Sequence, residues 1–375
     1  MKICYISNSA APSQNASSLQ IAKLCEEISK SGHKLVLILP DTGYHYKNFN
    51  NFYNIKSKYK IKKLKFFRKF PQGLNYYLYS IFSILVSNIK NQDLYITRNF
   101  LVSFILCILN KKHIIEIHDD IELEGRIIKF LIKYTKFLNN NSIIKLITTT
   151  RTLKRKYIKS HKVNKEKIIV LHNSSSLNAS FKIYKKINKR LNIGYFGSIY
   201  QSRGIETILN LSIKDYKNNY IIFGGDKSQI KKIKKKYPNK NLYLKSHIPY
   251  SQIKNKLDKI DICILPYSKK ITVSGNVGDI SKYTSPLKIF DYMKTGKLIM
   301  CSNLPVLREV LIHNKNSIFL NMNINTEIWL KNINLIKQNL NKFNKIRLNA
   351  YKYANTFNIN WRVNKILSFY HKLYR

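Results

Sequence analysis

Residues 285–303, SPLKIFDYMKTGKLIMCSN, contain a helix start, a helix end and a buried strand in one short stretch. Ser285 is suited to cap the helix, with Pro286 as its first residue. Gly296 favours the left-handed conformation that closes a helix. The apolar residues 298–301 then predict a buried strand. A helix that leads straight into a buried strand is typical of a parallel sheet built from β-α-β units.

The same alternation of short β-branched strands and longer helical segments runs along most of the 375 residues. The predicted strands form two series: residues 2–7, 34–40, 94–99, 113–118, 144–150 and 167–173, then residues 191–197, 219–225, 242–247, 262–267, 298–302 and 317–321. The polar, basic segment 174–190 is predicted to be a linker. We therefore expect an α/β protein of two doubly wound domains, residues 1–175 and 190–355, with a final helix, residues 356–375, packed on the first.

The composition is strongly basic, with 67 Lys and Arg against 19 Asp and Glu and a formal net charge of +48. Such a charge favours nucleic acid or an anionic membrane as partner. The alternative is that the charge reflects a biased amino-acid composition and lies on solvated faces, since Lys, Asn, Ile and Tyr are all abundant. The lysines are spread over the whole chain, without a zinc-finger, RNP-type or helix-turn-helix signature. A specific nucleic-acid-binding protein is therefore kept only as an alternative.

The five cysteines are widely spaced, and most lie in apolar, strand-like runs. They are expected to be reduced core residues of a cytosolic protein, and no Cys/His cluster predicts a metal site. The N-terminus lacks the long apolar region of a signal peptide. The apolar stretches fall short of the roughly 20 residues that span a bilayer. The sequence thus predicts a soluble or peripheral cytoplasmic protein.

Residues 55–89 join a run of lysines and arginines to an aromatic, apolar segment. This pairing suits an anionic membrane surface, where cations meet headgroups and rings enter the interface. A basic loop followed by a core helix explains the pattern equally well.

Glycines are scarce, and eight of the twelve lie in the second half of the chain. Several directly follow predicted strands, at the edge where open α/β sheets bind ligands. In GYFGSIYQSRG, residues 194–204, a strand ends at Gly197 and Arg203 precedes a helical pattern. Backbone amides at a helix N-terminus and an arginine form a natural phosphate site. The alternative is that tight turns need glycine for steric reasons alone.

The helix predicted to begin at Ser285 has free amides and a dipole that attract an anion. Lys288 and Asp291 lie three residues apart, on one face of this helix. The lysine can reach a phosphate, and the carboxylate can accept hydrogen bonds from hydroxyl groups. This combination predicts a nucleotide-diphosphate site. The alternative is an ordinary capped helix with an ion pair between Lys288 and Asp291.

A cluster of acids, EIHDDIELEG at residues 116–125, overlaps the end of the strand predicted at residues 113–118. His118 and Asp119 stand at this strand end and are suited to hydrogen bonding a polar substrate. A helix start whose dipole is complemented by acids explains the rest of the cluster. His247 is a further candidate, with loop capping as the alternative.

Five stretches of the second half occur in an order that matches a known family. They are NIGYFGSIYQSRGIETIL, IIFGGD, LKSHIPYSQI, DICILPYS and YTSPLKIFDYMKTGKLIMCSNLPVLREVL. Together they resemble the donor domain of retaining glycosyltransferases of family 4, of the bacterial surface-polysaccharide type. Residues 6–40 resemble the acceptor domain. The resemblance covers most of the chain and is weakest over residues 45–90.

The resemblance implies a GT-B fold, with two Rossmann-like domains facing a central cleft. It implies transfer of a sugar from a nucleotide-diphosphate sugar to a glycan or lipid-linked acceptor, with retained anomeric configuration. Polysaccharide or lipopolysaccharide synthesis at the inner face of the cytoplasmic membrane would be the setting, with an anionic membrane surface as partner. No metal or other cofactor is expected besides the donor substrate. A GT-B nucleotide-sugar epimerase or a phosphorylase is the alternative that keeps the fold.

By position, Arg203 resembles the cation that holds the donor diphosphate, Asp291 the acid that binds the ribose, and His118 the histidine near the transferred sugar. With the candidates above, the expected site has three groups. The catalytic group is His118, Arg203 and Lys288; the donor-binding group is Gly197, Ser198, Gly225, His247, Asp279, Ser285, Pro286, Leu287 and Asp291; the acceptor-side group is Ser13, Asn15 and Asp119.

The sequence departs from the family pattern at three places. Ser198 stands where many members have an arginine, so Lys288 is expected to supply part of that charge. Tyr283 occupies the position of the first of the family's two glutamates. Asp279 is expected to contact the sugar in place of that glutamate. Asn15-Ala16 replaces the glycine pair of the first loop.

Overall fold

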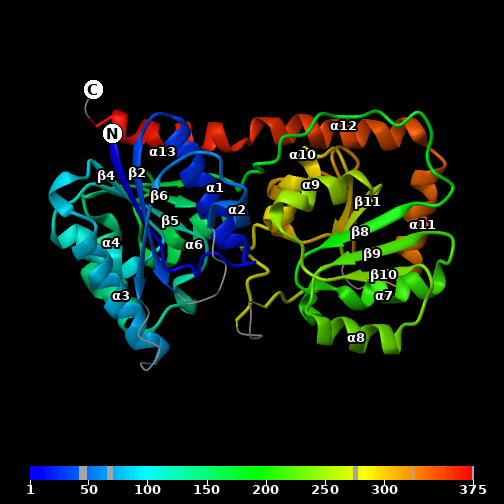
Figure 1. Ribbon diagram of the computed structural model, residues 1–375, viewed down its shortest axis with the longest axis horizontal. Coiled ribbons are helices and arrows are strands. Elements are labelled where there is room, and N and C mark those ends of the chain that lie inside the picture. Colours follow the sequence, from blue (N-terminus) through cyan, green and yellow to red (C-terminus); the bar gives the residue numbers. More distant parts are fainter. Residues whose placement is uncertain (42–48, 66–70, 273–277, 322–324, 374–375) are drawn as a thin grey trace. The chain divides into compact units, whose positions relative to one another are not determined.

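The computed structural model describes residues 1–41, 49–65, 71–272, 278–321 and 325–373 (Figure 1). The chain divides into two compact units. Unit 1 comprises Met1–His172 and Ile359–Arg375, and unit 2 comprises Asn173–Asn358. Each unit contains one parallel sheet packed with helices, so the expected α/β class is confirmed.

Unit 1 has a seven-stranded sheet in the order β3-β2-β1-β4-β5-β6-β7. Its strands are β1 (Lys2–Ile6), β2 (Lys34–Asp41), β3 (Lys60–Lys65), β4 (Leu94–Thr97), β5 (His113–Ile117), β6 (Ile143–Thr148) and β7 (Ile168–Val170). Its helices are α1 (Ala16–Lys30), α2 (Phe49–Tyr53), α3 (Gln72–Val86), α4 (Phe100–Ile108), α5 (Arg126–Thr135), α6 (Arg151–His161) and α13 (Ile359–His371). Three short 3-10 helices are η1 (Ile89–Asn91), η2 (Ile121–Leu123) and η3 (Phe137–Asn139).

The central strand β1 explains why unit 1 needs helices on both faces of its sheet. Ile3 and Tyr5 belong to a core cluster with α1 and α13, whereas Cys4 and Ile6 belong to a second cluster with α3 and α4. Successive side chains of a strand point to opposite faces, so a fully apolar strand is buried only if both faces are covered. Helix α13, from the end of the chain, therefore completes the core of unit 1.

Unit 2 has a six-stranded sheet in the order β10-β9-β8-β11-β12-β13. Its strands are β8 (Asn192–Phe196), β9 (Asn219–Phe223), β10 (Leu242–Lys245), β11 (Ile262–Leu265), β12 (Leu298–Ser302) and β13 (Ile318–Leu320). Its helices are α7 (Ile205–Lys214), α8 (Lys227–Lys236), α9 (Tyr250–Asp258), α10 (Leu287–Lys294), α11 (Thr326–Lys337) and α12 (Leu340–Thr356), with 3-10 helices η4 (Gln201–Arg203) and η5 (Pro305–Glu309). Across the described residues, no helix combines the length and apolarity needed to cross a bilayer.

Two local predictions differ from the structure. The segment 174–190, expected to be a linker, packs within unit 2, where the guanidinium of Arg347 lies 3.8 Å from the ring centroid of Tyr184 and donates to the carbonyl of Lys182. Helix α10 begins one residue later than expected. Pro286 has extended backbone angles and is the N-cap, so Ser285 lies outside the helix.

The order of strands marks one ligand position in each sheet. The chain order reverses between β1 and β4 in unit 1 and between β8 and β11 in unit 2. At such a reversal the loops after neighbouring strands diverge and leave a crevice at the carboxyl ends. Arg98 directly follows β4, and Gly197 directly follows β8.

Candidate functional site

Two glycines shape the carboxyl end of the unit 2 sheet. Gly197 has a φ of 136°, and a Cβ there would lie 2.3 Å from the ammonium nitrogen of Lys288. Gly204 has a φ of 70°, and its Cβ would lie 1.6 Å from the carbonyl oxygen of Pro266. Backbone atoms therefore exclude a larger residue at Gly204, whereas at Gly197 a side chain would strain the backbone and displace the Lys288 ammonium group. The scarcity of glycine in the sequence was thus a useful signal for these two turns.

Lys288 projects from the first turn of α10 toward the strand end at Gly197. Its Nζ lies 4.2 Å from the ring centroid of Tyr195 and 5.9 Å from that of Tyr267. In the described part of the chain it has no hydrogen bond or ion pair. Burial, together with nearby Arg203, holds its pKa well below the usual value. A bound anion would favour the charged form again, which makes this lysine a candidate anion ligand.

Arg203 lies at the end of η4, beside the same aromatic ring. Its guanidinium carbon is 5.6 Å from the ring centroid of Tyr267, and Nη2 donates to the carbonyl of Thr272 at 3.3 Å. Arg203 and Lys288 thus share Tyr267, and the described residues place no carboxylate in an ion pair with either. Two cations close together without a counter-charge form a site suited to a diphosphate. Sequence reasoning missed both tyrosines, because nothing in a strand pattern distinguishes a ring under a cation from a core ring.

Asp291 of α10 faces a different set of partners. Its Oδ1 accepts hydrogen bonds from Ser175 Oγ at 2.6 Å and from Tyr250 Oη at 3.0 Å. Burial raises the pKa of this carboxyl to about 7, against the opposing effect of the two hydrogen bonds. Lys288 and Asp291 form no ion pair, so the simple capped-helix alternative is not what the structure has. Gly296 closes α10 with a φ of 61°, as expected.

The remaining donor-side candidates lie around these residues and have distinct contacts. The carbonyl of Ser198 accepts from Tyr195 Oη at 2.9 Å. His247 is half-buried, and its pKa is lowered by burial and by Lys288. Asp279 is exposed, and its Oδ1 accepts from the backbone amides of Ile271 at 3.1 Å and Ser281 at 2.9 Å. Asp279 therefore bonds backbone amides on both sides of it in the chain.

Backbone geometry accounts for the other four members of the donor group. Gly225 has a φ of 79°, and a Cβ there would lie 2.4 Å from Ile199 Cδ1. The carbonyl of Ser285 accepts from Asn173 Nδ2 at 2.7 Å. Pro286 accepts from the amide of Ile289 at 3.2 Å, and Leu287 is the first residue of α10.

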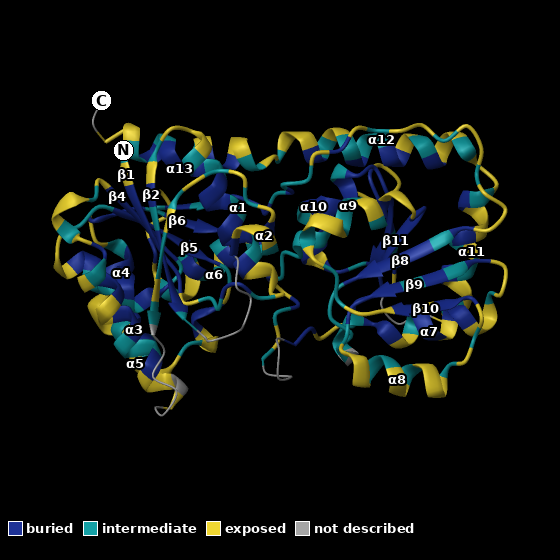
Figure 2. Cartoon of the chain, in the orientation of Figure 1, coloured by how far each residue is buried: buried dark blue, intermediate teal, exposed yellow. Residues whose placement is uncertain are grey.

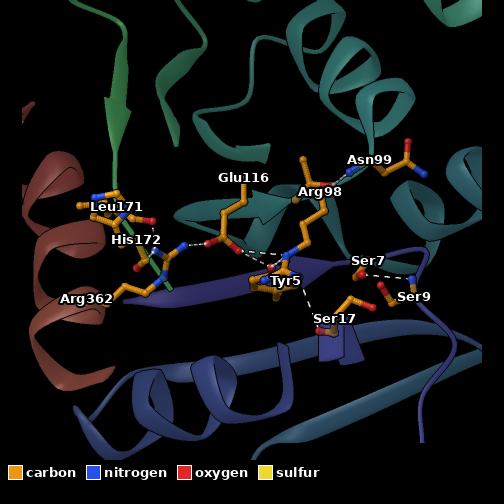
Figure 3. A network of polar contacts seen from close by, with 11 residues as sticks. Tyr5, Ser7, Ser9, Ser17, Arg98, Asn99, Glu116, Leu171, His172 and Arg362 are labelled. Atoms are coloured by element: carbon orange, nitrogen blue, oxygen red, sulfur yellow. Dashed lines mark hydrogen bonds and ion pairs between the residues drawn. The ribbon is translucent and has the colours of Figure 1, made fainter. Parts of the chain in front are cut away.

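In unit 1, a buried ion network lies at the carboxyl ends of β1, β4 and β5 (Figure 3). Glu116 Oε2 accepts from Tyr5 Oη at 2.6 Å and from Arg98 Nε at 3.2 Å. Its Oε1 accepts from Arg362 Nη2 of helix α13 at 2.5 Å. Burial alone would raise the pKa of Glu116, but the two guanidiniums hold it below its usual value. The network combines two cations with one anion, a net charge of +1.

His118, the predicted catalytic histidine, directly follows β5 and stands beside this network. Its Nε2 is buried and has no hydrogen-bond partner among the described residues. The same is true of Arg98 Nη2. Burial and the charge of Arg98 hold the pKa of His118 well below its usual value, although Glu116 opposes this. The ring is therefore neutral near pH 7, and it can exchange a hydrogen bond with a sugar hydroxyl without carrying a charge.

The acceptor-side candidates have mainly local contacts. Asp119 is exposed, and its carbonyl accepts from Tyr157 Oη at 3.2 Å. Ser13 Oγ lies 2.8 Å from Ser18 Oγ, and its backbone amide donates to Tyr53 Oη at 2.8 Å. Asn15 is the exposed N-cap of α1, without a side-chain capping bond.

The predicted residues therefore fall into separate groups. Unit 2 brings Gly197, Arg203, His247 and Lys288 together, with Asp291 on the same helix but in contact with other partners. Unit 1 holds His118, Asp119, Ser13 and Asn15. The described residues contain no cluster of three or more His, Cys, Asp or Glu side chains arranged to hold a metal ion.

Comparison with known proteins supports the architecture. No family model and no curated protein matches the sequence. Among solved structures, the chain is similar to a glycosyltransferase from Rickettsia africae ESF-5 (TM-score 0.72, 13% identity, 100% of this chain and 99% of that chain covered). It is also similar to Anabaena Alr3699/HepE in complex with UDP-glucose (TM-score 0.70, 13% identity, 98% and 99% covered). A third similar structure is a mutant of S. aureus TarM in complex with Fondaparinux, alpha-GlcNAc-glycerol and UDP (TM-score 0.72, 11% identity, 99% and 100% covered).

These likenesses extend over nearly the full length of every chain compared. Together with the two parallel sheets, they establish a two-domain, Rossmann-like GT-B fold. The expected fold class is confirmed.

Proposed function

We propose that this protein is a glycosyltransferase that moves a sugar from a nucleotide-diphosphate sugar to a glycan or lipid-linked acceptor, with retention. The GT-B fold supports an enzyme of this class, and the similar HepE and TarM structures were solved with UDP or UDP-glucose. The observation that carries the proposal is a pair of cations, Arg203 and Lys288, beside Tyr267 at the strand ends of unit 2, for which the described residues supply no carboxylate partner.

Transfer breaks the bond between the anomeric carbon and the diphosphate oxygen, so negative charge grows on the leaving diphosphate. Arg203 and Lys288 would bind this group more strongly as its charge develops, which lowers the barrier. The acceptor hydroxyl oxygen forms the new bond from the same face, and the leaving phosphate oxygen takes its proton. Such a route needs no protein nucleophile and no cofactor besides the donor.

The other candidates take positioning and binding roles. Asp291, held by Ser175 and Tyr250, would accept hydrogen bonds from the ribose hydroxyls. His118, neutral and with an Nε2 that no described residue bonds, would bind a hydroxyl of the transferred sugar. The loops that carry Ser13, Asn15 and Asp119 would contact the acceptor. We further propose that the protein takes part in cell-surface polysaccharide synthesis at the inner face of the cytoplasmic membrane.

A thermal-shift panel of UDP-, GDP- and CMP-sugars tests the proposal. One nucleotide class should raise the melting temperature in a concentration-dependent way, because a ligand that binds only the folded state stabilises it. The same donor should then be turned over, with transfer or slow hydrolysis that releases the nucleoside diphosphate. An interconverted sugar still attached to its nucleotide would instead favour an epimerase. No shift with any nucleotide sugar or nucleoside diphosphate would refute the proposal.

A further inference from the structure

Helices α3 and α4 contain no charged residue, although 23% of the chain is charged. Both pack one side against the sheet, through Tyr79 and Ile84 of α3 and Val102 and Leu106 of α4. The other side of α3 is exposed, as is the C-terminal end of α4. Helix α3 exposes Leu74, Ile81, Phe82 and Leu85, the last at 65%, and the end of α4 exposes Ile108 and Leu109.

Helix α5 has the same character with added positive charge. Ile128 and Ile132 are buried, whereas Ile127, Phe130 and Tyr134 are 53% to 63% exposed along one stripe of the helix. The rings of Phe130 and Tyr134 lie 4.6 Å apart. Arg126, Lys133 and Lys136 are exposed on or next to the helix, and Lys129 is paired with Glu122 at 3.4 Å.

Helices α3, α4 and α5 lie in one region of unit 1 (Figure 2), and we call their exposed residues the α3–α5 face. A Cβ on Gly125, at the start of α5, would lie 3.5 Å from Tyr77 Oη of α3. A groove of about 380 Å³ lies between α4 and the end of α5, lined in part by Phe104, Ile108 and Thr135. Of 19 large apolar side chains exposed among the described residues, ten lie between Leu74 and Tyr134, about a sixth of the chain. The clustering marks an interaction surface, since scattered exposed residues need no partner.

The charges indicate what covers this surface. Cations at the edge of apolar and aromatic side chains fit anionic headgroups above an acyl layer. A second copy of this chain, at +48, would bring like charges together across the same face. We propose that the α3–α5 face docks unit 1 on the surface of an anionic lipid bilayer, with Ile127, Phe130 and Tyr134 entering the interface. This inference rests on the proposed function, because a glycosyltransferase with a lipid-linked acceptor would meet that acceptor at a membrane surface.

This proposal modifies the prediction for residues 55–89. That prediction included the apolar side chains of α3, and the proposal adds those of α4 and α5, which lie outside that range. Residues 66–70 of the basic run lie outside the described residues.

Sedimentation with sucrose-loaded vesicles tests the proposal, with equal parts of phosphatidylglycerol and phosphatidylcholine or with phosphatidylcholine alone. The full chain should bind the anionic vesicles selectively. The triple variant Ile127→Ser/Phe130→Ser/Tyr134→Ser should bind them at least about tenfold more weakly, because three interfacial side chains are lost. UDP binding by the same variant should be unchanged.

Two matched variants separate this face from general stickiness. Ile213→Ser/Tyr216→Ser removes exposed apolar side chains of unit 2, and Lys234→Gln/Lys235→Gln removes charge from the basic helix α8. Each should change vesicle binding less than about twofold. Equal loss in a control, or no preference of the wild type for anionic vesicles, would overturn the proposal. So would light scattering that shows the α5 variant dissociating a dimer while vesicle binding persists. Absent UDP binding with intact vesicle binding would contradict the proposed function alone.

Discussion

Lys288 is half-buried, lies near a second cation and has no hydrogen-bond or ion-pair partner in the described part of the chain. Burial and Arg203 lower its pKa, and a bound diphosphate would raise it again. Binding should therefore take up a proton, and the affinity for UDP should fall as the pH rises through the lowered pKa. Calorimetry in two buffers of different ionisation enthalpy measures this uptake.

The variant Lys288→Arg is the matched control for that titration, because a guanidinium stays charged throughout. It should bind UDP with a flatter pH profile. Identical proton uptake by wild type and variant would show that another group titrates.

Gly197 provides a steric test of the same place. The variant Gly197→Ala should displace the ammonium group of Lys288, because the new Cβ would lie 2.3 Å from Nζ. UDP affinity should fall about tenfold or more, as for loss of a charged hydrogen bond. The control is Gly32→Ala, which shares a positive φ, 82°, but has no atom within 4 Å of the new Cβ. Equal UDP affinity in both variants would contradict the close approach of Lys288.

Asp291 gives a stability prediction with a definite sign. Its pKa, raised to about 7 in the folded protein, means that the folded state holds the proton more tightly than the unfolded chain. The protonated carboxyl therefore adds up to about 4 kcal/mol to the free energy of unfolding below the unfolded pKa of about 4. This contribution is lost as the pH rises through about 7. In urea titrations, Asp291→Asn should remove most of that decline between about pH 5 and about pH 8. A variant that declines as steeply as wild type would disprove it.

Sequence reasoning reached these residues unevenly. Gly197, Arg203 and Lys288 could be proposed because each stands beside a strand end or a helix start, which local patterns locate. Glu116 was noted only as part of the acidic cluster at residues 116–125, and its partner Arg362 is 246 residues away in the chain. No periodicity links residues so distant, so the network of unit 1 needed the structure.

At the scale of elements, helix α13 is held to unit 1 by both apolar and ionic contacts. Val363 and Ile366 enter the core, while Arg362 bonds Glu116 and the carbonyls of Leu171 and His172. The variant Arg362→Met should lower the free energy of unfolding by about 3 to 5 kcal/mol, because Glu116 loses a buried partner. Urea unfolding measures this difference.

The double variant Glu116→Gln/Arg362→Met completes a cycle. It should recover part of the loss, because the unpaired charge is gone. The control variant Lys372→Met replaces an exposed lysine and should lower the free energy of unfolding by less than about 0.5 kcal/mol. Additive losses in the cycle would contradict the ionic account of how α13 is held.

Element boundaries were predicted to within a residue where local chemistry fixes them, and poorly where distant packing does. Gly296 closes α10 as expected, whereas Pro286 takes extended angles, so the helix starts at Leu287. The polar segment 174–190 looked like a linker because its partner, Arg347, lies far along the chain and stacks on Tyr184. Composition alone cannot reveal such a partner.

For the whole molecule, the two series of apolar strands predicted two parallel sheets, and the family resemblance added the expectation of a GT-B fold. Strands β4, β5, β11 and β12 are buried on both faces, as in a covered parallel sheet, whereas the edge strands β3 and β10 carry lysines. The charge of +48 was ambiguous in sequence, because it is spread along the chain. Folding separates its parts: unit 2 holds the half-buried pair of Arg203 and Lys288, and α5 carries lysines beside exposed rings.

The central claim is that unit 2 binds a diphosphate through Arg203 and Lys288. Isothermal titration of UDP, GDP and CDP into wild type, Arg203→Ala, Lys288→Met and the exposed-lysine control Lys282→Ala tests it most directly. The account predicts saturable binding of one nucleotide by wild type and Lys282→Ala, with a loss of about tenfold or more in each of the other two variants. Equal binding by all four proteins, or by none of them, would contradict it.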